Sequence, residues 1–382
     1  MKNKILIVGG DHHNTLGLIE SFAEKHLMVH VIVLTKDSWA YVLKSNNIIE
    51  GWVCHTGDDI INIMINQFKD ETHKVIVFST SDETANILDK NTEALSSKFV
   101  LPNIINGGNL ENVMDKEYMS SLARTKRINV PKTWVVADGI IPEDVEYPCI
   151  TKAISSVKGT KSNLRIFREK QELEEFIKTS NRCSIIQIQK YIDKKYEFQF
   201  LGCSLDYGKE ILIPGRTHID RPNAIENTYF LSFDKLEPEY FELKNKIIQF
   251  IKEVGYQGLF SVEFLRSKDN IDYFTEMNYR NDGNAYCATS SGINLPYIYY
   301  LYNSGGDYKK EIEESRVVKV FLMPEVYYFR CLLAKEFGLF EWYKNMRKTT
   351  CYTTFFKHDI KPFIYFFLLK IIHLFRRLIK RF

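Results

Sequence analysis

Residues 1–105 alternate short apolar runs with segments of helical hydrophobic spacing. The runs KILIVGG, VHVIVLT and KVIVFST, at 4–10, 29–35 and 74–80, are typical of buried parallel strands. A helical pattern of apolar residues follows the first run, from residue 16 to residue 23. This order predicts an open, Rossmann-like α/β sheet, which binds ligands where its strands end. The glycine pair in GGDHHN lacks the three-glycine spacing of a nicotinamide-binding fingerprint.

The next part of the chain, residues 106–190, predicts a smaller α+β unit. Helices are expected from Asp115 to Ala123 and from Glu169 to Lys178, with strands near 130–134, 147–152 and 183–187. An antiparallel pair at 196–201 and 209–213 is expected to complete it. Between two of these strands, SSVKGTKS at 155–162 has the small, cationic composition of a loop over phosphates. Lys158 and Lys161 supply charge and Gly159 allows close approach, although an ordinary solvated position is the alternative for each lysine.

The third region contains a predicted β-hairpin. GLFSVEFLR at 258–266 and IDYFTEMNYR at 271–280 flank the turn SKDN. Alternation in the first strand places Glu263 on the face opposite its aromatic residues. In the return strand it places Glu276, Asn278 and Arg280 together on one face. Counting outward from the turn brings Glu263 close to Glu276.

Two carboxylates and an amide oxygen in one place predict a cation site. Glu263, Glu276 and Asn278 would offer the hard oxygen ligands that Mg²⁺ takes, with its remaining positions left to phosphates and water. Arg280 would project toward the same anion. The sequence therefore indicates a magnesium-phosphate site on the hairpin.

Composition and charge limit the class of protein. The chain has 382 residues, 45% of them hydrophobic, and its seven cysteines include no CxxC pair, which favours a reducing cytoplasm over a disulfide framework or a zinc site. The start of the chain does not resemble a signal peptide. Residues 357–382 hold seven Lys or Arg and one Asp, so this tail carries +6 and the rest of the chain −3. Because the basic character belongs to the tail, we expect no nucleic-acid partner.

The tail itself predicts a basic amphipathic helix. Its most apolar part, Phe363 to Phe375, is 13 residues long and contains Lys370 and His373, which is short of the ~20 residues needed to span a bilayer. Arg376, Arg377, Lys380 and Arg381 follow. Two interpretations stay open, and both can hold: a helix lying in the surface of an anionic membrane, or a helix packed on the core.

These motifs together resemble the ATP-grasp superfamily of carboxylate-amine ligases, such as D-alanine:D-alanine ligase, biotin carboxylase, carbamoyl phosphate synthetase and D-aspartate ligase. The resemblance is carried by DKEYMSSLARTKRINVPKTWVV, PCITK, IIQIQKYIDKKYEF and the hairpin, of which Glu-x-Asn-x-Arg after an acid-bearing strand is the strongest element. It implies a mixed α/β and α+β fold with an N-terminal pre-ATP-grasp domain (1–105), a linker helix and lid (106–190), a catalytic subdomain (191–330) and a C-terminal helical extension (331–382).

The resemblance also assigns roles by position. It implies that Glu263, Glu276 and Asn278 hold Mg²⁺, with Mn²⁺ as an alternative, and that Arg280 and Lys152 stabilise the transferred phosphoryl group. ATP would be bound by Lys116, Lys152, the loop residues Lys158, Gly159 and Lys161, the hinge Gln189, Lys190 and Tyr191, and Glu197. Gln189-Lys190 stands where many relatives have Glu-Glu. Arg216, with His218, is a weaker candidate that could instead belong to an ordinary loop.

The resemblance implies an ATP-dependent ligase that forms an amide through an acyl phosphate. Gly10, Asp11, His12, His13, Arg280, Asp282 and Gly283 are the candidate substrate-binding residues. A membrane-associated tail would suit a cell-envelope glycan, sugar nucleotide or peptidoglycan precursor as the acid, but neither the acid nor the amine can be identified. An inactive ATP-grasp scaffold that binds nucleotide or glycan at the membrane is the alternative. The oligomeric state stays open, a homodimer included.

Overall fold

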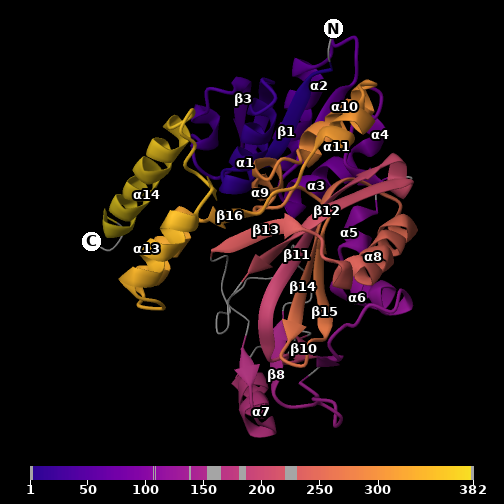
Figure 1. Cartoon of the computed structure of the whole chain (residues 1–382), viewed down its shortest axis with the longest axis vertical. Helices are drawn as coiled ribbons and strands as arrows, with labels where there is room; N and C mark the ends of the chain where they lie inside the picture. The colour runs from indigo at the N-terminus through magenta and orange to yellow at the C-terminus, as the bar shows by residue number, and fades with distance from the viewer. Residues whose placement is uncertain are drawn as a thin grey trace.

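The computed structural model describes residues 3–105, 107, 109–136, 139–152, 165–179, 186–219 and 230–379, apart from the side chains of Lys152 and of 373–379. Its strands form a parallel sheet, a small antiparallel sheet and a large, mostly antiparallel sheet. In Figure 1 the parallel sheet lies at the top, the large sheet in the middle and the small sheet at the bottom. The large sheet in the middle of the molecule therefore combines strands from distant parts of the sequence.

The parallel sheet has the strand order β3-β2-β1-β4-β5, as in doubly wound folds. Its strands are β1 (Ile5–Gly10), β2 (Val29–Leu34), β3 (Ile48–Cys54), β4 (Val75–Ser79) and β5 (Phe99–Val100). Four helices accompany it: α1 (His13–Ala23), α2 (Gly57–Gln67), α3 (Asp82–Lys90) and α4 (Thr92–Leu95). The three apolar runs of this region are confirmed as strands. The edge strand β3 was not predicted, because exposed and polar residues interrupt its apolar pattern.

The small sheet has the order β7-β10-β8-β9 and carries one helix on its surface. Its elements are β7 (Thr133–Val136), β8 (Cys149–Lys152), β9 (Ile166–Phe167), α7 (Lys170–Thr179) and β10 (Ile186–Lys190). Before it, α5 (Leu110–Val113) and α6 (Lys116–Thr125) lead away from the parallel sheet. Asp115 caps α6 by accepting hydrogen bonds from the backbone N–H groups of Glu117 and Tyr118, at 3.0 and 2.9 Å.

The large sheet has the order β15-β14-β11-β12-β13-β16-β17, and β6 (Asn103–Ile104) pairs with β14 outside this path. Its strands are β11 (Lys194–Leu205), β12 (Glu210–Ile219), β13 (Leu231–Lys235), β14 (Tyr256–Ser267), β15 (Asp272–Asn278), β16 (Val320–Met323) and β17 (Cys351–Tyr352). The predicted antiparallel pair is present as β11 and β12. It belongs to this sheet and not to the small α+β unit, because β11 pairs with β14 along ten residues.

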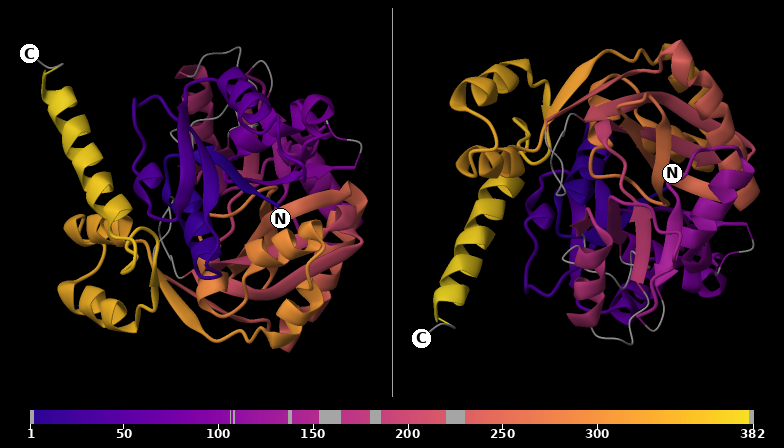
Figure 2. Two further views of the ribbon diagram at one scale, coloured as in Figure 1. Left: turned by 90° about the horizontal axis from the view of Figure 1, so that it is seen from above. Right: turned by 90° about the horizontal axis from the view of Figure 1, so that it is seen from below.

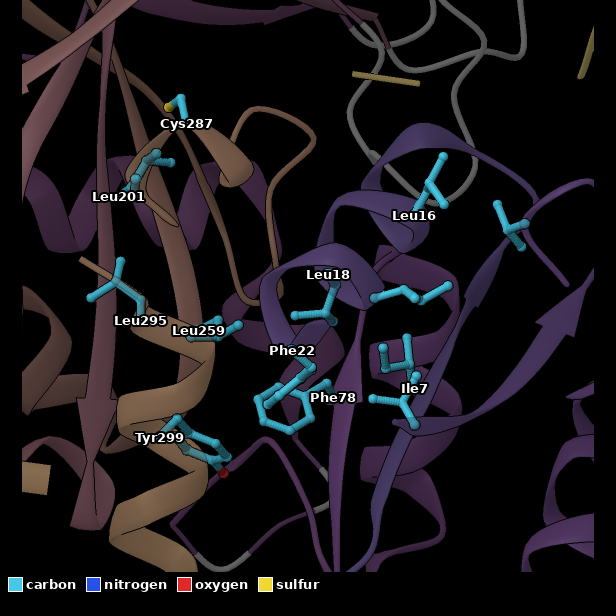
Figure 3. Packing of buried hydrophobic residues seen from close by; sticks show 14 of the residues in the cluster. Ile7, Leu16, Leu18, Phe22, Phe78, Leu201, Leu259, Cys287, Leu295 and Tyr299 are labelled. Atoms are coloured by element: carbon cyan, nitrogen blue, oxygen red, sulfur yellow. The ribbon is translucent and has the colours of Figure 1, made fainter. Parts of the chain in front are cut away.

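The helices around the large sheet are α8 (Phe241–Val254), α9 (Tyr286–Ser290), α10 (Leu295–Ser304) and α11 (Tyr308–Glu314). A core under α6 and α8 buries the aromatic face of β11 and β14, including Phe198, Phe200 and Phe264. A second core joins this sheet to the parallel sheet, with Phe78 of β4 between Phe22 of α1 and Tyr299 of α10 (Figure 3). This shared core holds the ends of β1 and β4 against the large sheet.

The C-terminal part consists of α12 (Glu325–Leu333), α13 (Leu339–Lys348) and α14 (Lys361–Ile379). All the views in Figures 1 and 2 place α13 and α14 on the same side of the molecule, standing off from the sheets. Phe366 of α14 packs edge-on against Tyr41 at 5.0 Å between ring centroids, and Leu369 is buried. Packing on the core is therefore confirmed for one side of α14, whereas the other side is exposed and the membrane interpretation stays a prediction. None of the helices described here combines the length and the apolar character needed to cross a membrane.

Candidate functional site

The hairpin β14–β15 brings the two predicted acids together. Glu263 and Glu276 are direct cross-strand partners, and Ser261 is the partner of Asn278. A β-bulge at Thr275 produces this register, and the Thr275 hydroxyl donates to the backbone carbonyl oxygen of Glu263 at 2.9 Å. Strict alternation would have put Phe274 on the acidic face. The bulge returns it to the core while Glu276 and Asn278 stay together.

Glu263 is the centre of a polar network on this face. Its Oε1 accepts hydrogen bonds from Gln199 Nε2 at 3.0 Å and from Asn278 Nδ2 at 3.1 Å. Burial, followed by the nearby charges of Glu276 and Asp282, raises the pKa of Glu263 well above its usual range. A cation placed here would offset this repulsion, and the two carboxylates and one amide are oxygen donors that suit Mg²⁺. The two carboxylates therefore suit the ion that the sequence predicts, whereas Asn278 Oδ1 already accepts a hydrogen bond from Arg280 Nη2.

No group of three or more His, Cys, Asp and Glu side chains within the described ranges is arranged to hold a metal ion. The candidate magnesium site is a set of a different composition, with an amide as its third member.

Arg280 lies two residues beyond the end of β15, which stops at Asn278 and not at residue 280 as predicted, and it is close to the acids. Its Nη2 donates to Asn278 Oδ1 at 3.0 Å, and its Nε donates to Asp82 Oδ1 at 2.8 Å. Asp82 is the first residue of α3, so this ion pair joins the end of the hairpin to the parallel sheet. Its low exposure, with 17% of the Arg280 side chain and 23% of the Asp82 side chain accessible, limits screening by solvent.

Asn281, the residue after Arg280, attaches this part of the chain to the parallel sheet. Its backbone N–H donates to the carbonyl oxygen of Ser79 at 3.0 Å. Asn14 Nδ2 in turn donates to the carbonyl oxygens of both Thr80 and Asn281, each at 2.7 Å. Because both asparagines are buried, this arrangement sets the position of Arg280 relative to the strand ends.

The candidate substrate residues of the N-terminal region lie at the end of β1. His12 and His13 are half-buried, and burial lowers the pKa of both, that of His12 to about 3. Both imidazoles are thus neutral near pH 7. Gly283 lies beneath His13, since a Cβ on Gly283 would come within 2.7 Å of His13 Nε2. The structure thus brings the predicted histidines next to the predicted glycine.

Asp11 has a different environment from the histidines. Its carboxylate accepts hydrogen bonds from the backbone N–H groups of Tyr41 and Val42, both at 3.1 Å. Burial raises the pKa of Asp11 to about 6 in spite of these bonds. The carboxylate therefore holds the loop at 41–42 in place, while Gly10 beside it accepts from the Thr15 hydroxyl at 2.7 Å.

The hinge residues end β10 in the small sheet. The backbone N–H of Lys190 donates to the carbonyl oxygen of Lys132 at 2.8 Å, and that of Tyr191 donates to Pro148 at 3.0 Å. Gln189 Nε2 donates to Thr133 Oγ1 at 3.3 Å, and Lys190 pairs with Glu146 at 2.7 Å. These donors are thus already engaged within the small sheet.

Glu197 lies on the same face of the large sheet as Gln199 and pairs with Lys194 at 2.7 Å. Lys116 is half-buried at the first position of α6. Lys152 is the cross-strand partner of Gln187, and its side chain lies outside the described residues. Lys158, Gly159 and Lys161 lie outside them as well, as does the rest of the loop 155–162.

Arg216 is in β12 and not in a loop, and it lies on the opposite face of the sheet from Glu263. Its cross-strand partner is Phe200, and its guanidinium lies 4.3 Å from the ring centroid of Tyr240. Nε and Nη2 bind both oxygens of Glu237 at 2.9 Å. His218 shares this face, with its ring tilted against that of Tyr196 at 4.3 Å between ring centroids. This geometry does not support nucleotide contact by Arg216 or His218.

Four contributors to the site were not predicted: Gln199, Ser261, Asp82 and Asn281. The first two had a signal in the sequence, because each is two residues from a predicted acid on the same strand face, Gln199 from Glu197 and Ser261 from Glu263. Asp82 ends the polar segment that follows the third apolar run, where open α/β sheets bind ligands, but its contact with Arg280 and that of Asn281 with Ser79 span about 200 residues of sequence and had no signal.

Comparisons with known proteins agree with this architecture. No family model matches the chain. Of the curated proteins, the small subunit of 2-oxoglutarate carboxylase from Hydrogenobacter thermophilus is 31% identical over 190 residues, which cover 43% of this chain and 39% of that protein. The chain thus matches about two fifths of the length of that relative.

Solved structures match over more of the chain. An L-amino acid ligase from Bacillus licheniformis has a TM-score of 0.65 at 16% identity, covering 84% of this chain and 79% of that one. The biotin carboxylase domain of the Hydrogenobacter thermophilus 2-oxoglutarate carboxylase, solved as a dimer with MgADP, ADP and bicarbonate, has a TM-score of 0.64 at 17% identity, covering 84% and 74%. N5-carboxyaminoimidazole synthetase from Staphylococcus aureus has a TM-score of 0.61 at 16% identity, covering 80% and 79%. The chain therefore has the ATP-grasp fold, and the fold class predicted from its sequence is confirmed.

Proposed function

We propose that this chain is an ATP- and magnesium-dependent ligase that joins a carboxylate to an amine. The observation that carries the proposal is the meeting of Glu263, Glu276 and Asn278 beside Arg280 in an ATP-grasp fold. Structures of similar fold include an L-amino acid ligase and a biotin carboxylase domain with MgADP. Both acids of the hairpin are present, which favours an active enzyme over an inactive scaffold.

In the proposed reaction a carboxylate oxygen attacks the γ-phosphorus of ATP, which forms an acyl phosphate and releases ADP. The amine nitrogen then attacks the acyl carbon, the C–N bond forms, and phosphate leaves while the nitrogen loses a proton. Mg²⁺, when bound, neutralises phosphate charge. Arg280 adds a fixed positive charge there, and its bonds to Asp82 and Asn278 hold it in place before reaction.

We propose that the nucleotide lies between the small and the large sheet. Lys116, Lys152, Lys158, Gly159, Lys161, Gln189, Lys190, Tyr191 and Glu197 would contribute to its binding. Residues 1–105, 106–190, 191–330 and 331–382 would act as the pre-ATP-grasp domain, the linker and lid, the catalytic subdomain and the C-terminal extension. Closing the lid would exclude water, which hydrolyses acyl phosphates.

The acceptor pocket is proposed at the end of β1, formed by Gly10, Asp11, His12 and His13 with Asp282 and Gly283. Neutral imidazoles at His12 and His13 would hydrogen-bond a substrate without repelling an amine. Asp282 is buried, and its carboxylate accepts from the Ser261 hydroxyl at 3.0 Å, so it would orient the loop and its neighbours.

We further propose that the acid belongs to a cell-envelope glycan, a sugar nucleotide or a peptidoglycan precursor. The support is indirect: the basic tail would hold a cytoplasmic enzyme at the inner face of the membrane, through residues 357–382. A homodimer is part of the same proposal, since the similar biotin carboxylase domain was solved as a dimer.

The test is ADP release from magnesium-ATP with pools of carboxylates, each offered with and without pools of amines. The pools should contain uronic-acid sugar nucleotides, peptidoglycan precursors and free amino acids. Release that needs one acid pool and one amine pool supports the proposal and names the substrate classes. Failure of every combination, by protein that binds magnesium-ATP, would favour the scaffold.

A further inference from the structure

We propose that the turn between α12 and α13 inserts into the surface of an anionic lipid bilayer. This turn and its flanking residues, 332–340, are called the hairpin tip below. The inference deepens the proposed membrane association and does not depend on the ligase reaction. It concerns residues outside the tail from which that association was first predicted.

The hairpin tip exposes large apolar side chains to an unusual degree. Phe340 is 81% exposed, Leu339 71% and Leu333 67%. Among the residues that the structure describes, these are three of the four most exposed large hydrophobic side chains, with Ile140 as the fourth at 73%. Three such residues within eight positions form a patch, whereas Ile140 is isolated in sequence from the others.

These side chains are not needed for the packing of the hairpin itself. Tyr328 of α12 stacks on Phe337 at 4.6 Å between ring centroids, and Asn345 of α13 donates to the Tyr328 hydroxyl at 2.5 Å. Trp342 faces partly inward from α13. The two helices are therefore held together by contacts at other positions, and Leu333, Leu339 and Phe340 point outward from a defined turn.

The charges in the sequence on either side of the hairpin tip favour an anionic partner. Residues 330–350 contain five cations, Arg330, Lys335, Lys344, Arg347 and Lys348, against two acids, Glu336 and Glu341. Apolar side chains at a tip whose flanking sequence carries an excess of cations suit the boundary of a bilayer that contains anionic lipid, because the apolar groups enter the boundary and the cations attract the headgroups. A neutral or cationic protein surface would match the apolar side chains but not this excess of cations, and an anionic protein surface would not explain why the apolar side of α14 is exposed as well.

The helix α14, one side of which is exposed, lies on the same side of the molecule as α12 and α13 (Figure 2). Ile364, Phe367, Leu368 and Ile371 are each between 44% and 49% exposed, while Phe366 and Leu369 pack on the body. In the sequence, Arg376, Arg377, Lys380 and Arg381 follow. One side of α14 is already packed on the core and is not free to enter a bilayer. The more exposed hairpin tip would therefore contribute most of the apolar side chains that enter the bilayer.

The experiment is flotation of the full chain with vesicles of phosphatidylcholine and phosphatidylglycerol, compared with phosphatidylcholine alone. We expect binding to the anionic vesicles that weakens as salt is raised. The double variant Leu339→Glu, Phe340→Glu should bind about tenfold more weakly or worse, since it loses apolar burial and adds repulsion. Ile140→Glu is the matched control and should bind like the unmodified chain.

Depth is tested by fluorescence quenching with brominated acyl chains. Trp342 is two residues from Phe340, so we expect quenching that Trp342→Phe removes. Equal binding by the double variant with an unchanged melting temperature would overturn the proposal, as would absence of binding by the unmodified chain. A concentration-dependent dimer that the double variant abolishes would overturn it too and assign the patch to a second copy. ADP release measured without vesicles reports on the ligase separately.

Discussion

Glu276 has a position that costs stability unless a cation is present. It lies directly opposite Glu263, and it shares the polar face of the hairpin with Asn278. Two ionised carboxylates on directly opposite residues of paired strands repel one another, and a cation bound between them offsets the repulsion. The pair thus lowers the stability of the metal-free fold and favours binding of a metal ion.

Replacing Glu276 by Gln should separate these effects. The change keeps the shape and removes one charge, so we expect turnover to fall by about a hundredfold or more. The melting temperature should stay the same or rise, because repulsion of Glu263 is relieved. Kinetics at several magnesium concentrations and a thermal melt measure both, with the exposed turn variant Asp269→Asn as control. Unchanged turnover in Glu276→Gln would remove the pair from the mechanism.

The sequence predicted this acidic face well, because period-two alternation of a strand is a local property. Glu263, Glu276 and Asn278 meet as expected. The ion-pair partner of Arg280 could not be predicted, since Asp82 reaches it only through the packing of one sheet on another. Arg216 was predicted as a possible ATP-binding residue, but it lies on the other face of the sheet. The face on which it lies follows from the register of β12 with β11, which the sequence left open.

At the scale of elements, the close approach of β1 and β4 shapes the end of the parallel sheet. A Cβ on Gly9 would lie only 1.7 Å from Thr80 Oγ1 and 2.8 Å from Thr15 Oγ1. These two hydroxyls hydrogen-bond one another at 2.7 Å. The glycine therefore allows the strand end and the start of α1 to meet beneath the candidate acceptor pocket.

Gly9→Ala should destabilise the fold by about 1–3 kcal/mol, because buried neighbours must move to make room. Urea unfolding measures this directly. Gly338→Ala is the control, since no atom lies within 4 Å of the added Cβ, and its effect should stay within about 0.5 kcal/mol. Equal stability of Gly9→Ala and the unmodified chain would show that the side chains of Thr80 and Thr15 can move aside without cost.

Elements with a strong apolar period were predicted, and those shaped by their neighbours were not. β1, β2 and β4 are buried on both faces and appear as continuous apolar runs. β3 is an edge strand whose pattern is mostly exposed, and the bulge at Thr275 has no signal in a single sequence.

At the scale of the whole molecule, a pair of buried acids joins the C-terminal extension to the N-terminal sheet. Glu20 of α1 and Asp359, just before α14, are both inaccessible to solvent. Asp359 accepts hydrogen bonds from the backbone N–H of Asn46, at 3.2 Å to each oxygen, and His358 lies 2.7 Å from Glu20. Burial, followed by the charge of Asp359, raises the pKa of Glu20 from 4.5 to about 9.

This pKa predicts a pH dependence of stability. Between pH 4.5 and about 9 the folded chain keeps a proton on Glu20 that the unfolded chain has lost, so the free energy of unfolding should fall as pH rises. One such proton contributes a slope of at most about 1.4 kcal/mol per pH unit. Glu20→Gln should flatten the curve, measured by urea unfolding at several pH values, whereas the exposed-site control Glu50→Gln should keep it. A slope that survives in Glu20→Gln would show that other groups cause it.

The central claim, transfer of phosphate to a carboxylate, is tested most directly with a substrate acid labelled with ¹⁸O in its carboxylate. The acid is the one that supports ADP release in the pooled screen, and the released phosphate is analysed by mass spectrometry. An acyl phosphate loses its bridging oxygen to phosphate when the amine attacks, so we predict one labelled oxygen in each phosphate. Unlabelled phosphate, formed while ADP and the amide accumulate, would contradict the proposed mechanism.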